Sequence, residues 1–263
     1  VALLRRPRIG DKIDFGRIYS PRGGADTSGT PLPLCPVRDL ETLMLQVLPH
    51  ERELVHYLFV VVGADVGEGE IFTMCVVRNL LFFVVAERFA YTEREFRASI
   101  EKHKTARGRA KEDAPTVGDY EAAVAAAANA IIARLPTGYD VVFLSGAGTT
   151  HDEQRVVVDT QQRGGHATAA TNDIAHALVF RGVLLFVIEE FRFSQCCPID
   201  PSHRWSAALQ YARVRVCALF HANDTAVVMD KDMSSALIAA RIAVGLVSGL
   251  TLADARPVAL KRR

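Results

Sequence analysis

Residues 183–193 read Val-Leu-Leu-Phe-Val-Ile-Glu-Glu-Phe-Arg-Phe, an apolar run with three charged side chains near its end. Together with the residues from Asp173 onward, this run predicts a helical hairpin or one long helix whose apolar second half is central. In a helix, Glu189 and Arg192 are three residues apart and share one face. Burying such a pair costs free energy and often adds no net stability. The pair is therefore a candidate for chemistry, and a core helix with an internal salt bridge is the alternative.

Size and composition are typical of a soluble globular protein. The chain has 263 residues, of which 49% are hydrophobic and 23% are charged, enough for one large domain with or without a small lobe. The apolar stretches 80–86 and 183–188 are too short to span a bilayer, so no membrane association is expected. The net charge of +1 does not draw the whole chain onto nucleic acid. RNA contacts would need local basic clusters, and the candidates are 107–111, 213–215 and 261–263.

Cysteines and histidines give no metal-binding pattern. The five cysteines include the adjacent pair Cys196 and Cys197 without a CxxC spacing, and none of the eight histidines belongs to an HExxH pair. No metal or cofactor is expected. The odd cysteine count favours a reduced, cytoplasmic setting, and a secreted or vacuolar one stays open.

The order of elements predicts an α+β fold. Runs rich in β-branched and aromatic residues predict strands at 56–62, 71–77, 80–86, 89–96 and 139–144, the first two as a hairpin. The Ala-rich segment Tyr120–Arg134 predicts a helix, and the polar segment 146–172 predicts a mobile insertion. Strands followed by helices are typical of α+β proteins.

The C-terminal part is expected to form a small lobe. Segments 214–220 and 225–229 alternate as in a hairpin, and a final helix is expected over 234–247. The expected organisation is an N-terminal mixed or antiparallel sheet, a central helical region with the candidate helix, and this hairpin-plus-helix lobe. The boundary between the main domain and the lobe is expected at residues 211 and 212.

The motif Glu189-x-x-Arg192-Phe193, followed by Trp205-Ser-Ala-Ala-Leu, resembles the active-site helix and tryptophan of the ribosome-inactivating proteins, the ricin A-chain type of rRNA N-glycosidase. Weaker similarities run in the same order. The segment 78–85 resembles that family's Asn-x-Tyr strand, and 118–121 its Gly-x-Tyr-Asp turn. The C-terminal segments 239–243 and 249–253 are similar to the cereal-type members.

The resemblance implies removal of one adenine from a loop of large-subunit ribosomal RNA, which stops translation. It implies that Glu189 stabilises the ribose oxocarbenium ion, that Arg192 assists the departing adenine, and that Trp205 forms the pocket wall. Tyr120 would stack on the base, and Gly118 would let the backbone approach it. The implied partners are the ribosome and the product adenine, with the protein a monomer.

Two departures from the family pattern leave alternatives open. The tyrosine position of the Asn-x-Tyr strand holds Leu81 with Phe82 beside it, and the spacer between Arg192 and Trp205 is short. A catalytically weak or inactive relative that binds RNA or another partner is therefore the second hypothesis. Tyr139, which also follows a glycine, is the rival of Tyr120. A third hypothesis, an unrelated nucleotide-binding enzyme, rests on Gly146 and Gly148, which are more typical of a plain turn.

Overall fold

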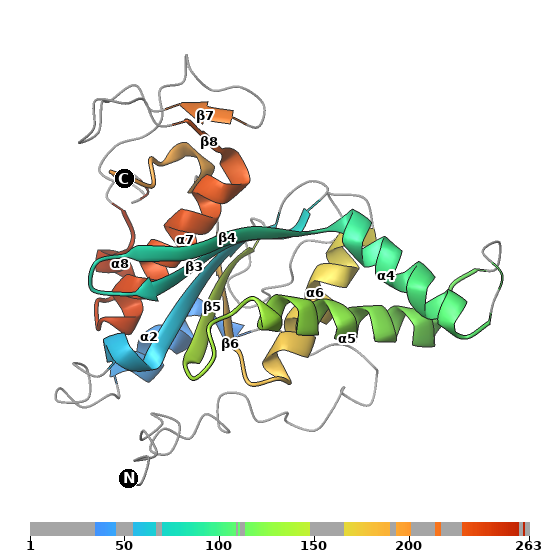
Figure 1. The fold of residues 1–263 in the computed structure, drawn as a ribbon. Helices are drawn as coiled ribbons and strands as arrows, with labels where there is room; N and C mark the ends of the chain where they lie inside the picture. The colour runs from blue at the N-terminus through green and yellow to red at the C-terminus, as the bar shows by residue number, and fades with distance from the viewer. Residues whose placement is uncertain are drawn as a thin grey trace, which may run out of the picture.

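A six-stranded mixed sheet forms the centre of the protein (Figure 1). The computed structural model describes residues 35–45, 55–66, 70–108, 110, 114–147, 166–189, 193–200, 214–216, 228–257 and 260. The strands are β1 (Cys35–Pro36), β2 (Phe59–Asp65), β3 (Glu70–Asn79), β4 (Val84–Thr92), β5 (Asp140–Ala147) and β6 (Leu184–Glu189). Their order in the sheet is β1-β6-β5-β2-β3-β4. The first four strands in that order are parallel, and β3 and β4 continue the sheet as antiparallel neighbours.

Helices cover both faces of the sheet, and each face has its own hydrophobic core. The first core contains α2 (Val37–Leu45) and α7 (Lys231–Val247). The second core contains α4 (Glu93–Ala106), α5 (Val117–Ala133) and α6 (His166–Val179). Figure 1 shows α7 on one side of the sheet and α5 and α6 on the other. The presence of helices together with a mixed sheet is consistent with the predicted α+β class.

The expected central helix over the second half of 173–193 is wrong, because Leu184–Glu189 forms the strand β6. The first half of this region is helical as expected, in α6, which ends at Val179. A turn through Gly182, whose φ is +85°, separates the helix from the strand. A strand in a parallel sheet is buried on both faces, so it has the same uninterrupted apolar pattern as a buried helix. Glu189 therefore does not lie on a helix face with Arg192.

The predicted hairpin of the first two long strands is confirmed by the antiparallel pairing of β2 with β3. The expected strand over 80–86 is interrupted, because Leu80–Phe83 form a turn before β4. The expected strand over 89–96 ends at Thr92, whose side chain forms a capping box with Glu95 and starts α4. The capping box satisfies backbone N–H groups that would be unpaired at the start of the helix. The helix therefore begins after Thr92, and the strand ends there.

Elements toward the C-terminus agree with their predictions where the structure describes them. The expected helix from Tyr120 corresponds to α5, and the expected final helix corresponds to α7. The C-terminal hairpin is present as β7 (Val214–Val216) paired antiparallel with β8 (Val228–Asp230). The short helix α8 (Leu252–Ala255) packs against α7. The boundary at 211 and 212 and most of the polar segment 146–172 lie outside the described residues and stay predictions.

Helix α7 crosses the sheet in direct backbone contact with β2 at Gly63. A Cβ added to Gly63 would lie 2.1 Å from the carbonyl oxygen of Ala236 and 2.2 Å from the backbone nitrogen of Ala240. Small side chains on α7 and the absence of a side chain at Gly63 therefore allow this close approach. The contact holds α7 over the middle of the sheet.

Candidate functional site

The backbone of Glu189 lies at the carboxyl end of a parallel strand. Glu189 is the last residue of β6 and pairs with Ala147, the last residue of β5. On the other side of β5, β2 ends at Asp65. In open sheets with parallel strands, ligands bind at the carboxyl ends of the strands. Glu189 is therefore at the end of the sheet where chemistry is expected, although it reaches that place on a strand.

Polar residues of neighbouring strands gather at this carboxyl edge. Asp65 and Ser145 are buried there, and Asp65 is paired in register with Thr73 of β3. The hydroxyl of Thr73 donates a hydrogen bond to the carboxylate of Glu70, at the start of the same strand. Acidic residues of β2, β3 and β6 thus stand at one edge of the sheet, with Glu189 placed there by its backbone. Such an edge suits a reaction in which positive charge develops.

Tyr120 connects two helices. Its hydroxyl donates a 2.7 Å hydrogen bond to Asp173 of α6, and its ring meets Phe96 of α4 edge-on, with centroids 5.5 Å apart. Burial and, next, the hydrogen bond to Asp173 raise the pKa of Tyr120, so the phenol is neutral at physiological pH. Its hydroxyl therefore contributes to helix packing.

Gly118 is covered by the guanidinium of Arg107, the C-cap residue of α4. The Nη2 of Arg107 donates a 3.3 Å hydrogen bond to the carbonyl oxygen of Gly118, and its Nη1 lies 3.3 Å from the buried carboxylate of Asp119. A Cβ at Gly118 would lie 2.7 Å from Nη1. The absence of a side chain at Gly118 therefore allows Arg107 of the same chain to lie against the backbone here.

We expect Tyr120→Phe to lower the free energy of unfolding by about 1.5 kcal/mol. This is the lower end for a hydrogen bond to a charged group, because the half-buried Asp173 can take water in place of the hydroxyl. Urea unfolding measures the change. Tyr139→Phe is the matched control, because its hydroxyl accepts only a 3.5 Å hydrogen bond from the exposed Arg78, and it should change stability by less than about 0.5 kcal/mol. Equal losses in the two variants would contradict the role of Tyr120.

His176, one turn after Asp173 on α6, gives a pH prediction. Burial lowers the pKa of His176 below the usual histidine value of about 6.5, and the charge of Asp173 opposes the shift. Just below pH 6.5 the unfolded chain therefore binds more protons at His176 than the folded chain does. The stability gained by keeping His176 neutral is complete above that pH, and it is lost as pH falls through the pKa of the folded state. We expect the wild type to lose more stability between pH 7 and 5 than His176→Gln, measured by melting temperature. Parallel losses would contradict this expectation.

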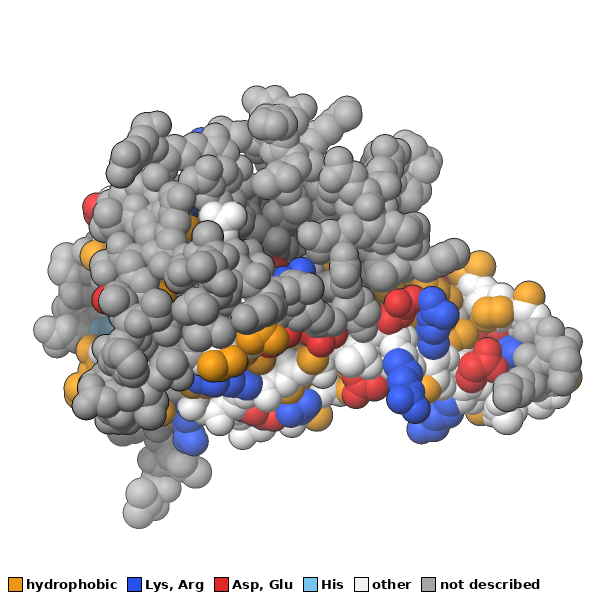
Figure 2. Space-filling model, turned by 90° about the horizontal axis from the view of Figure 1, so that it is seen from above, with side chains coloured by type: hydrophobic (Ala, Val, Ile, Leu, Met, Phe, Trp, Pro, Cys, Tyr) orange, Lys and Arg blue, Asp and Glu red, His pale blue; other side chains and the backbone are white. Residues whose placement is uncertain are grey.

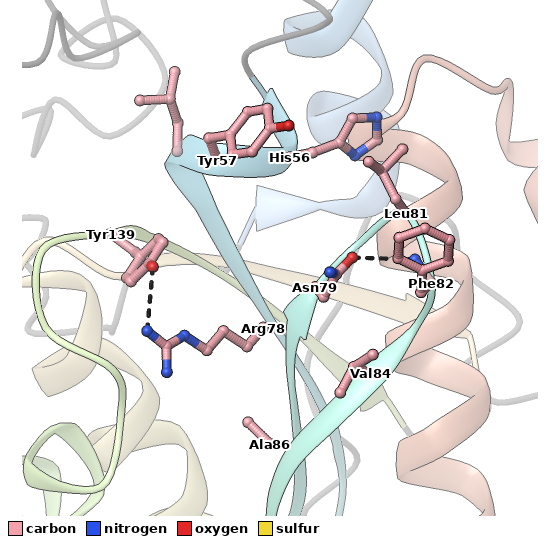
Figure 3. A pocket seen from close by; sticks show the side chains of 10 residues that line it. His56, Tyr57, Arg78, Asn79, Leu81, Phe82, Val84, Ala86 and Tyr139 are labelled. Carbon is pink, nitrogen blue, oxygen red and sulfur yellow. Dashed lines mark hydrogen bonds between the residues drawn. The ribbon is translucent and has the colours of Figure 1, made fainter.

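Leu81 and Phe82 lie in an open cleft at the other end of the sheet (Figure 3). We call it the aromatic cleft; its volume is about 970 Å³, and it is lined by His56, Tyr57, Leu58, Arg78, Asn79, Leu81, Phe82, Val84, Ala86 and Tyr139. Figure 3 shows Tyr139 on one side and Leu81 with Phe82 on the other, with Arg78 and Asn79 between them. The cleft thus contains two predicted site residues and the rival tyrosine, Tyr139.

The structure separates Leu81 and Phe82 from Glu189. Val61 of β2 pairs with Val77 of β3 and with Val142 of β5, and Val142 pairs with Leu184 of β6. These four paired residues form one row across the sheet. Because β3 runs antiparallel to β2, β5 and β6, the C-terminal ends of β3 and β6 lie on opposite sides of this row. They are about seven residues apart along the strands, or roughly 20 Å. The expectation of one pocket holding all these residues is therefore wrong for Leu81 and Phe82.

Sequence reasoning missed Tyr57 and His56 as cleft residues, because they precede β2 and approach Arg78 only through the pairing of β2 with β3. Tyr120 does not line the cleft. Arg192 and Trp205 lie outside the described residues, and their places in the site stay predictions. The side chain of Glu189 likewise lies outside the description, so its distance to Arg192 stays a prediction.

On the face of the molecule drawn in Figure 2, the charged side chains of the described residues are mixed in sign. Figure 2 shows acidic and basic groups interspersed over the part of the chain that is coloured. Along α4, for example, Arg97 pairs with Glu93. Within the described ranges, no group of acidic, histidine or cysteine side chains could hold a metal ion, and no helix is long and apolar enough to cross a membrane.

No protein-family model matches the chain, and no curated protein matches it.

Proposed function

We propose that the protein is an rRNA N-glycosidase that removes an adenine from large-subunit ribosomal RNA. The observation that carries the proposal is the position of Glu189 at the carboxyl end of β6, at the same edge of the sheet as Asp65 and Ser145. The motif Glu189-x-x-Arg192-Phe193 and Trp205 support the particular reaction. Glu189 and Arg192 are the catalytic residues of this proposal.

In the proposed reaction, the bond between the ribose carbon and the adenine nitrogen breaks toward an oxocarbenium ion. Glu189 stabilises this cation and orients the attacking water. Water adds to the ribose carbon and loses a proton, and adenine leaves after gaining one, so that charge and atoms balance. Arg192 stabilises the negative charge that develops on the departing base, and Trp205 forms the wall of the pocket.

Aniline cleavage of ribosomal RNA tests the proposal. Depurination leaves an abasic ribose at which aniline breaks the RNA, so incubation of ribosomes with the protein should release one discrete fragment. Ribosomes incubated without protein are the control. Intact RNA after prolonged incubation with folded protein at high concentration would contradict the assignment.

A second candidate function is RNA binding without catalysis. The separation of Leu81 and Phe82 from Glu189 favours it, because a residue that stacks on the base must lie near the carboxylate that stabilises the ribose cation. Filter binding of the ribosomal RNA loop, combined with an absence of aniline fragments, would support this function over depurination.

A further inference from the structure

We propose that the aromatic cleft binds a nucleoside monophosphate unit, either as a free nucleotide or within single-stranded RNA. This site is remote from Glu189 and does not depend on depurination. The base would lie against the aromatic and aliphatic side chains of the cleft, and the phosphate would bind Arg78.

The walls of the cleft expose an unusual amount of apolar surface. Phe82 is 79% exposed, Tyr57 is 65% exposed and Leu81 is 58% exposed, although all three are large hydrophobic residues. They border the same concavity as Tyr139. Single exposed hydrophobic residues are common, but several around one hollow mark a binding site. Aromatic rings at such a site suit a planar base, because every base has a face that stacks.

The charges of the cleft select an anionic ligand. The described residues that line it include Arg78 and His56, and none of these described residues is acidic. The guanidinium of Arg78 lies 5.7 Å from the ring centroid of Tyr139. Its 3.5 Å hydrogen bond to the hydroxyl of that tyrosine is at the limit of hydrogen-bonding distance. A phosphate would form shorter, charge-assisted hydrogen bonds with the same guanidinium.

The turn that carries Leu81 and Phe82 is fixed from within. The side chain of Asn79 accepts a 3.1 Å hydrogen bond from the backbone N–H of Phe82, and Leu80 is buried. Phe83 has a φ of +50°, which is rare for a bulky residue, and the guanidinium of Arg241 lies 4.3 Å from the centroid of its ring. These contacts fix the backbone of the turn from which Leu81 and Phe82 project, without a ligand. A preorganised wall lowers the entropy cost of binding.

Calorimetric titration with AMP, adenosine and inorganic phosphate tests the proposal. We expect saturable binding of AMP, weaker binding of adenosine, and little preference for AMP over adenosine in Arg78→Gln. Phe82→Ser should weaken AMP binding about five- to a hundredfold, the range for loss of one stacking ring. Phe180→Ser is the matched control, because Phe180 is 77% exposed and does not line the cleft, and it should leave the affinity unchanged.

Two further arms complete the test. Leu81→Tyr adds a ring at an exposed position and should tighten AMP binding without lowering the melting temperature. A short single-stranded oligoadenylate distinguishes the two sources of the ligand, because it should bind more tightly than AMP only if the cleft binds RNA strands.

Absence of saturable AMP binding, or equal affinities in wild type and Phe82→Ser, would overturn the proposal. Self-association that Phe82→Ser abolishes, without nucleotide binding, would assign the cleft to a second copy instead. The aniline-cleavage assay reports on Glu189, whereas the loss of AMP binding in Phe82→Ser reports on the cleft, so failure here and failure of the glycosidase assignment are distinguishable.

Discussion

Gly63→Ala is expected to lower the free energy of unfolding by about 3 kcal/mol, the upper end of the range for overpacking a core. The added Cβ would lie 2.1 Å from the carbonyl oxygen of Ala236 and 2.7 Å from the Cα of Ala240. Both are backbone atoms of α7, so no side chain can rotate away, and the helix must move off the sheet. Such a loss is a large part of the total stability of a typical domain.

Chemical denaturation measures the effect of Gly63→Ala, and Gly182→Ala provides the control. A Cβ at Gly182 has no neighbouring atom within 4 Å among the described residues, but its φ is +85°. Its replacement should cost only about 1–2 kcal/mol, the strain of the left-handed backbone conformation. A Gly63→Ala protein as stable as the wild type would show that α7 does not pack on β2 as described.

Glu189→Gln is expected to slow depurination of ribosomes about a hundred- to a thousandfold, which corresponds to roughly 2.7–4 kcal/mol of transition-state stabilisation. The variant keeps the size of the side chain and one acceptor oxygen, but it replaces the other oxygen by an NH2 donor and removes the negative charge that the oxocarbenium ion needs. The rate of aniline-fragment release measures the effect, and the melting temperature shows whether the fold persists.

The control for Glu189→Gln is Glu190→Gln, which makes the same change of charge one residue along the chain. It should leave the rate within a few fold of the wild type. Active Glu189→Gln protein would remove Glu189 from the mechanism. A loss confined to Glu190→Gln would assign the catalytic acid to the neighbouring position.

The sequence alone predicted the elements whose patterns are local. Alternating and β-branched residues predicted the hairpin of β2 and β3, and the Ala-rich segment from Tyr120 predicted α5. The final helix and the short C-terminal hairpin also follow from local patterns. The elements could be predicted because each forms its hydrogen bonds or turns between residues that are close in the sequence. The α+β class then followed from the order of these elements.

The tertiary structure decided what depends on partners distant in the sequence. The apolar residues 184–188 can pack as a helix or as a buried strand, and only the ladders to β5 and β1 select the strand. The same ladders place Glu189 at one end of the sheet, while the antiparallel β3 carries Leu81 to the other. The residues around Gly63 in the sequence do not predict that its backbone contacts α7. Strand order, strand direction and helix packing depend on many contacts between residues that are distant in the sequence, so no local sequence pattern predicts them.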